Sequence, residues 1–172
     1  GEYKVQHFSA LLRDEIGGKA VNLIPGDRPR DIYQVVADKV NEILKQDAMN
    51  GTPDKPVKDE AGGYHIKYGT KSMAQEWLNF GVNRKVTKRS VMTLAYGSKE
   101  YGFRQQLLDD IIEPNIKQFV INKYSLAAYM AKLIWVSVTK TVVKAVEGMK
   151  WLQDVANIVC KGGKVVTWVT PM

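Results

Sequence analysis

The sequence predicts a mainly α-helical protein with one short strand close to its end. Apolar side chains recur every three to four residues in several long stretches of the 172-residue chain, as they do along one face of a helix. Only the stretch KVVTWVT has the β-branched composition typical of a strand. Hydrophobic residues make up 45% of the sequence and charged residues 25%, which is ordinary for a globular domain with a single core.

Two helices are predicted in the first third of the chain. A short helix is expected over residues 7–16, and a turn at residues 25–27 leads to a long amphipathic helix over residues 29–48. The apolar stripe of the long helix comprises Ile32, Val35, Val36, Val40, Ile43 and Leu44. We expect this stripe to face the core.

The rest of the chain alternates between surface and helical patterns. Residues 51–69 contain many glycines and prolines among charged side chains, so we expect a surface segment without core, with a hairpin around Gly62 and Gly63. The helical pattern then resumes. Pro114 predicts a kink or a helix boundary, and residues 125–159 again have helical periodicity, in one helix or two.

Residues 83–106, NRKVTKRSVMTLAYGSKEYGFRQQ, combine clustered cations with tyrosine–glycine pairs. The whole chain has a formal net charge of +7, which is typical of proteins that meet nucleic acid, nucleotide phosphates or an anionic membrane surface. A merely basic exterior is the alternative. Between residues 84 and 104 there is one anion, Glu100. Six cations lie in the same interval: Arg84, Lys85, Lys88, Arg89, Lys99 and Arg104.

A helix over residues 84–96 would bring part of this segment together in a row. Residues four apart lie on nearly the same side of a helix, so Arg84, Lys88, Met92 and Tyr96 form what we call the ridge. Lys88 and Tyr96 are then about 12 Å apart along the helix axis, comparable to the reach from a nucleotide's outer phosphates to its sugar. The helix amino terminus also favours anions. The sequence therefore predicts a phosphate site, with a solvated basic face as the alternative.

Tyrosine and glycine follow the cations at the end of this helix. Tyr96 offers a flat ring and one hydroxyl, suited to stacking or to a sugar contact, and Gly97 leaves room for a base or backbone to come close. The alternative is an ordinary helix end with a packed aromatic ring. Tyr101, Phe103 and Arg104 continue the aromatic and basic pattern that unpaired bases favour.

Other candidate sites have simpler interpretations. The two histidines, His7 and His65, and the single cysteine cannot form a zinc site of common spacing, so no metal site is predicted. His7 is expected to be structural and His65 solvated. Asp109 and Asp110 are expected on a solvated helix face. Two further residues, Trp135 and Trp151, are predicted to pack in the core or between subdomains. The most apolar run is too short to span a membrane.

The spacing Arg84-x3-Lys88-x7-Tyr96-Gly97 resembles the fingers motif of single-subunit, bacteriophage-type DNA-directed RNA polymerases. The longer stretch TKRSVMTLAYGSKEYGFRQQ resembles the coliphage members of that family. Three further stretches, VQHFSALLRDEIGGKAVNL, AAYMAKLIWVSV and WVTP, resemble the family in the same order. The resemblance covers nearly the whole chain, and residues 51–69 are its least similar part.

The resemblance implies roles for individual residues. Arg84 and Lys88 would bind the triphosphate of the incoming nucleotide, and Lys88 would also act as a catalytic residue that protonates the leaving pyrophosphate. Tyr96 would lie near the sugar and help to select ribose over deoxyribose. The residues expected at the template are Met92, Gly97, Tyr101 and Gly102.

The resemblance also implies a place for the chain in a larger enzyme. Residues 1–25 would form a palm-edge segment, residues 26–160 the helical fingers subdomain of a right-hand polymerase, and residues 161–172 a truncated strand. The expected partners are ribonucleoside triphosphates, the DNA template, the DNA–RNA hybrid and the missing palm and thumb, in the cytoplasm of a phage-infected bacterium and without a membrane. Self-association through apolar surface is left open.

Magnesium is the cofactor that the resemblance implies for the parent enzyme, because two metal ions clamp the attacking and leaving oxygens in such a reaction. Their two aspartates are expected outside this chain, before Gly1 and beyond Met172, so the isolated chain is expected to be inactive. Two alternatives remain: a non-catalytic helical nucleic-acid-binding module that kept the basic ridge, and a relative of the DNA polymerases.

Overall fold

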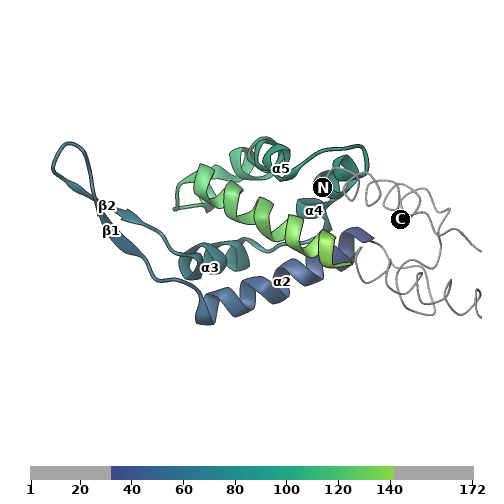
Figure 1. The fold of residues 1–172 in the computed structure, drawn as a ribbon, viewed down its shortest axis with the longest axis horizontal. Helices are drawn as coiled ribbons and strands as arrows, with labels where there is room; N and C mark the ends of the chain where they lie inside the picture. Colours follow the sequence, from purple (N-terminus) through teal and green to yellow (C-terminus); the bar gives the residue numbers. More distant parts are fainter. Residues whose placement is uncertain (1–31, 142–172) are drawn as a thin grey trace, which may run out of the picture.

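The computed structural model describes residues 32–141. Helices dominate this part of the chain, as predicted, and Figure 1 shows their arrangement. The α-helices are α2 (Ile32–Asn50), α3 (Thr70–Phe80), α4 (Arg84–Ala95), α5 (Glu100–Leu107) and a helix over residues 123–141, drawn in light green. The remaining elements are the π-helical turn η1 (Leu108–Ile112), the 3-10 helix η2 (Glu113–Gln118) and the strands β1 (Lys55–Lys58) and β2 (Tyr64–Lys67).

Several predicted features lie outside the described residues. They are the helix at 7–16, the turn at 25–27, the helical pattern at 142–159, the strand KVVTWVT, the segments 1–25 and 161–172, and His7, Trp151 and the single cysteine.

Helix α2 presents its apolar stripe to the other helices. The stripe is buried at Ile32, Val36, Val40 and Leu44 as predicted, and Ala37 is buried beside it. Val35 and Ile43, which flank the stripe, are only half-buried. The helix runs two residues past the predicted end at residue 48. Helices α3 and α4 both pack against it, so α2 supports the elements that carry the candidate site.

The core is centred on Trp77 of α3. Its side chain is fully buried and its indole nitrogen donates a hydrogen bond to the backbone oxygen of Leu126, 3.2 Å away. The rings of Phe80 and Phe119 lie 5.8 and 5.2 Å from the Trp77 ring, edge on. Because Leu126 belongs to the 123–141 helix, this one side chain joins α3 to the last described helix.

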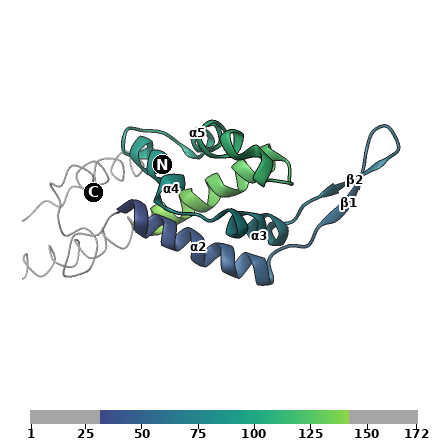
Figure 2. The same ribbon diagram turned by 180° about the vertical axis from the view of Figure 1, so that it is seen from behind.

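The strands form a projecting hairpin, which we call the arm (residues 55–67). Both views in Figures 1 and 2 show it extending from the end of the helical body that lies away from α4. The predicted turn at Gly62 is present, with a positive φ of 87°. None of the arm's side chains is buried, as a surface segment without core requires, although Gly69, at the end of the predicted range 51–69, is buried.

The base of the arm is held by polar contacts. The Thr52 amide donates to the Thr70 hydroxyl and the Thr70 amide donates to the Thr52 hydroxyl, both at 2.9 Å. Asp54 accepts from the Gly69 amide at 2.8 Å and from the Ser72 hydroxyl at 2.9 Å. These contacts hold the two ends of the arm next to each other where they leave the helical body.

Pro114 marks a helix boundary, as predicted, but the structure before it was not anticipated. Helix α5 continues into the π-helical turn η1, in which the Glu113 amide bonds to the Leu108 oxygen, five residues back. Pro114 lacks an amide hydrogen and its ring crowds the oxygen four residues earlier, so a regular α-helical turn is unfavourable there. The wider turn avoids this conflict, and η2 begins at Glu113 with the proline as its second residue.

Candidate functional site

The ridge of Arg84, Lys88, Met92 and Tyr96 lies along the exposed side of α4. The side chains of Arg84 and Lys88 are exposed, and Met92 and Tyr96 are 38% and 76% exposed. The opposite side of α4 is buried through Val86, Val91, Leu94 and the small polar residues Thr87 and Ser90. The amphipathic sequence of α4 therefore turns Arg84, Lys88 and Met92 away from the core, as the 3.6-residue period requires, and Tyr96 is exposed at the C-cap of the helix.

The two cations of the ridge, Arg84 and Lys88, lie in the amino-terminal part of α4. Asn83 caps this end, because its side-chain oxygen accepts a hydrogen bond from the Lys85 amide at 3.0 Å. The Arg84 guanidinium lies 5.3 Å from the centre of the Tyr33 ring on α2, a cation–π contact that places it. Within residues 32–141, the Lys88 ammonium has no acidic partner.

Neighbouring cations are partly neutralised. Arg89 Nη1 donates to both carboxylate oxygens of Asp110 at 2.7 Å, and the hydrogen bond to that carboxylate raises the pKa of Arg89 above its usual value. Arg104 lies 3.9 Å from Glu100. Asp110 was expected on a solvated helix face. It is exposed, but it also forms an ion pair with Arg89. Among these cations of α4 and α5, Lys88 therefore differs from Arg89 and Arg104, which both lie next to a carboxylate of the described residues.

A Schellman motif ends α4 and orients Tyr96. Helix α4 stops at Ala95, one residue before the predicted end, and Tyr96 is its C-cap residue. The Gly97 amide bonds to the Leu94 oxygen at 3.0 Å and the Ser98 amide to the Thr93 oxygen at 2.9 Å. Gly97 has a positive φ of 98°, and a Cβ atom there would meet nothing within 4 Å. Gly97 is therefore required by the backbone turn, whether or not a ligand approaches it.

Tyr101 and Gly102 open the next helix. Tyr101 is 79% exposed and its ring lies 5.8 Å from the Arg104 guanidinium. A Cβ atom on Gly102 would come within 2.8 Å of the Ser98 hydroxyl oxygen, so this glycine allows the turn to pack against α5. Both residues lie in the first turn of α5. The predicted site positions are therefore carried by α4, by the turn that follows it, which contains Tyr96 and Gly97, and by the start of α5.

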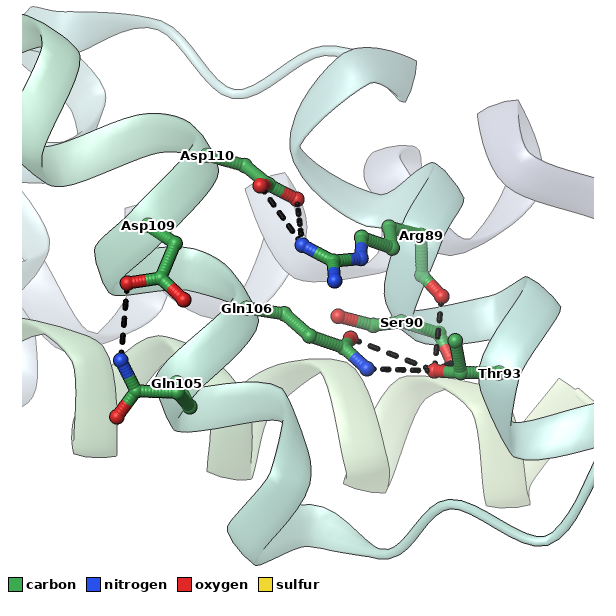
Figure 3. Close-up of polar contacts among 7 residues, drawn as sticks. All are labelled: Arg89, Ser90, Thr93, Gln105, Gln106, Asp109 and Asp110. Atoms are coloured by element: carbon green, nitrogen blue, oxygen red, sulfur yellow. Dashed lines mark hydrogen bonds and ion pairs between the residues drawn. The ribbon is translucent and has the colours of Figure 1, made fainter.

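Sequence analysis missed the polar contacts that join α4 to α5 and η1, which Figure 3 shows. One is the ion pair between Arg89 and Asp110. In the other, the Gln106 side-chain amide donates to the Thr93 hydroxyl at 2.9 Å, and that hydroxyl donates to the Arg89 backbone oxygen at 2.9 Å. The sequence shows that Arg89 and Thr93 are four residues apart on α4, and that Gln106 and Asp110 are four residues apart along α5 and η1. It does not show that the two segments face each other.

The described residues offer no metal centre. Among residues 32–141, no three side chains of histidine, cysteine, aspartate or glutamate are grouped so that they could hold a metal ion. His65, expected to be solvated, is exposed but hydrogen-bonded to Asp59 in the arm. No helix in this part of the chain is long and apolar enough to cross a membrane.

Comparison with known proteins identifies the family of the chain that carries this surface. A model of the family described as DNA-dependent RNA polymerase matches residues 4–172. This chain belongs to that family. The resemblance to phage members is confirmed, because the chain is 53% identical to the DNA-directed RNA polymerase of Enterobacteria phage T3 and to the T7 RNA polymerase of Escherichia phage T7. Each match covers 97% of this chain and 21% of the relative.

More distant members of the polymerase family also match along almost the whole chain. The mitochondrial DNA-directed RNA polymerase of Mus musculus is 32% identical over 98% of this chain and 12% of its own length. The chain therefore spans about a fifth of the length of the phage polymerases that it matches. The ridge lies inside the matched residues.

Proposed function

We propose that this chain forms the fingers of a DNA-directed RNA polymerase and that its ridge binds the triphosphate of the incoming ribonucleotide. One observation carries the proposal: Arg84 and Lys88 are exposed on α4, and Tyr96 is exposed at the C-cap of the same helix, in a chain of the polymerase family. Two cations at a helix amino terminus suit a polyphosphate. The exposed ring at the other end suits the sugar.

Each ridge residue has a part in the proposed reaction. The 3′ hydroxyl of the growing RNA gives up its proton to water as its oxygen attacks the α-phosphorus of the triphosphate, and the bond between that phosphorus and the pyrophosphate oxygen breaks. Arg84 and Lys88 stabilise the phosphate charge by direct contact, which is the main protein contribution in phosphoryl transfer. Lys88 donates a proton to the departing pyrophosphate. Tyr96 lies against the sugar and favours ribose.

The template side of the proposed site comprises Met92, Gly97, Tyr101 and Gly102. Tyr101 supplies an exposed ring next to Arg104, a combination that stacks on bases. In the parent enzyme the DNA template and the DNA–RNA hybrid would pass this face, while residues 1–25 would lead in from the palm and residues 161–172 would lead back to it. We place that enzyme in the cytoplasm of a phage-infected bacterium.

The parent reaction would also use Mg²⁺. The described residues do not fit a magnesium site, because no three acidic, histidine or cysteine side chains among them are grouped so that they could hold the ion. We propose that the required carboxylates belong to parts of the polymerase outside this chain, so that the chain by itself binds nucleotide without turning it over. No step assigned to the ridge depends on the metal.

Titration with a fluorescent ribonucleoside triphosphate tests the ridge. Lys88→Ala and Arg84→Ala should each weaken binding to the chain by about tenfold, because each removes a charge-assisted phosphate contact. Lys45→Ala is the matched control, since Lys45 is an exposed lysine on α2 and its loss changes the net charge equally. Fluorescence anisotropy gives the dissociation constants, and circular dichroism checks the fold.

Two results would count against the proposal. Equal affinities in all three variants would show that general charge, and not the ridge, attracts the triphosphate. A chain that binds single-stranded DNA but no triphosphate would instead support the non-catalytic nucleic-acid-binding module.

A further inference from the structure

Two polar rungs connect α4 to the helix that follows it. The first rung is the Arg89–Asp110 ion pair, with both oxygens 2.7 Å from one guanidinium nitrogen, and the second is the Thr93–Gln106 hydrogen bond at 2.9 Å. We call these four residues the strap. From the first rung to the second, the chain moves four residues forward along α4 and four residues back along η1 and α5. The two helical segments therefore run antiparallel and face each other across the strap.

The strap lies beside the ridge, on the same helix. Arg89 follows Lys88 by one residue and Thr93 follows Met92 by one residue, and one residue corresponds to a rotation of about 100° around a helix. If α4 rotated about its own axis relative to α5, which we call its roll, the ridge would therefore turn with it. The same rotation would lengthen the Arg89–Asp110 and Thr93–Gln106 contacts together. The strap and the ridge are mechanically linked through one rigid helix.

Other contacts of α4 leave this roll less well defined. Its buried face is mainly apolar, through Val86, Val91 and Leu94, and apolar packing has little directional preference. The Thr87 hydroxyl donates to the Tyr33 oxygen at 2.9 Å, which ties α4 to α2 but not to α5. Among the described residues, the strap provides the side-chain hydrogen bonds between α4 and the α5–η1 segment.

We propose that Arg89 and Asp110 are positioning residues that hold the ridge in a fixed orientation to Tyr101. The ion pair fixes the roll of α4, and the Thr93–Gln106 rung supports it one turn further on. The triphosphate contacts of Arg84 and Lys88 are thereby kept in register with the ring at the start of α5. This inference rests on the proposed function for what the ridge binds, but not for the role of the strap in orientation.

The chain contains a close control for Asp110. Asp109 is the adjacent carboxylate on η1, is also exposed, and accepts a hydrogen bond from Gln105 of α5 at 2.9 Å. Its partner lies on its own helical segment, so it makes no side-chain bond to α4. Asp109→Ala and Asp110→Ala change the charge of neighbouring positions by the same amount. A difference between them therefore reports the strap and not the local potential.

The orientation can be measured without any nucleotide. Spin labels at Lys85→Cys on α4 and Lys117→Cys on η2, in a Cys160→Ser background, give a distance distribution by double electron–electron resonance. Both lysines are exposed and neither belongs to the ridge or the strap. We expect Asp110→Ala to broaden or shift this distribution and Asp109→Ala to leave it unchanged. An unchanged distribution in Asp110→Ala would overturn the inference.

Nucleotide affinity supplies the second measurement. In unlabelled chains, Asp110→Ala should weaken binding of a fluorescent ribonucleoside triphosphate on the order of threefold, which is the scale of an exposed ion pair. Because the substitution makes the surface more positive, its charge alone would act in the opposite direction. The reversed pair Arg89→Asp with Asp110→Arg should restore both the distribution and the affinity. Equal affinity in wild type and Asp110→Ala, with a broadened distribution, would reduce the strap to a merely structural contact.

Failure of the proposed function is distinguishable from failure of this inference. If the ridge does not bind triphosphate, no variant binds it, while the label distances still differ between Asp110→Ala and Asp109→Ala. If the strap does not position α4, the label distances agree, while Lys88→Ala still lowers the affinity of the chain.

Discussion

Tyr129 in the 123–141 helix donates its hydroxyl hydrogen to Asp47 of α2, with 2.6 Å between the oxygens. Tyr129 is buried. Desolvation by burial raises the pKa of its hydroxyl well above the ordinary value, and the neighbouring Asp47 carboxylate raises it further. A phenolate at this position would be both desolvated and next to a negative charge. The folded state therefore keeps the tyrosine protonated.

This contact predicts a pH dependence of stability. Because the folded-state pKa is raised, the contribution to stability is complete below the unfolded tyrosine pKa of about 10 and is lost as the pH rises above that value. Thermal unfolding followed by circular dichroism should show Tm falling less between pH 9.5 and 11.5 in Tyr129→Phe than in wild type. Tyr64→Phe, in the exposed arm, should behave as wild type. A parallel fall in both variants would contradict the assignment.

At the level of elements, sequence periodicity predicted which helices form but not how they end. The stripe of α2 and the exposed ridge of α4 follow from residue spacing alone, because burial of one face imposes a period of 3.6. The Schellman turn at Gly97 and the π-helical turn before Pro114 depend on single backbone hydrogen bonds, which leave little trace in apolar patterning. Similarly, the Arg89–Asp110 pair required knowledge that α5 folds back along α4.

The arm provides a test of independence between elements. Replacing residues 55–67 by a two-residue Asn-Gly turn should change the free energy of unfolding by less than about 0.5 kcal/mol, because no side chain of the arm is buried. Urea denaturation measures this. As a comparison, Thr70→Val removes the hydroxyl that accepts a hydrogen bond from the Thr52 amide, while the bond from the residue-70 amide to the Thr52 hydroxyl remains, and should cost about 1 kcal/mol. A larger loss from the arm replacement than from Thr70→Val would show that the strands stabilise the body.

At the level of the whole molecule, stability depends on Trp77. Trp77→Ala should destabilise the chain by about 3–5 kcal/mol, since it empties the centre of the core and removes the indole hydrogen bond to the Leu126 oxygen. Trp135 is half-buried, and its ring lies 6.0 Å from Phe103. Trp135→Ala should therefore cost less. If urea denaturation shows that both substitutions lower the free energy of unfolding equally, Trp77 is not the centre of the core.

The strap and the Tyr129–Asp47 contact differ in how much chain each one encloses. Thr93 and Gln106 are 13 residues apart in sequence, whereas Asp47 and Tyr129 are 82 apart. Closing the longer loop costs about 1.6 kcal/mol more in chain entropy. During folding, α4 and α5 can thus meet before the last described helix finds α2, so the helix pair that bears the ridge is expected to assemble before that helix docks.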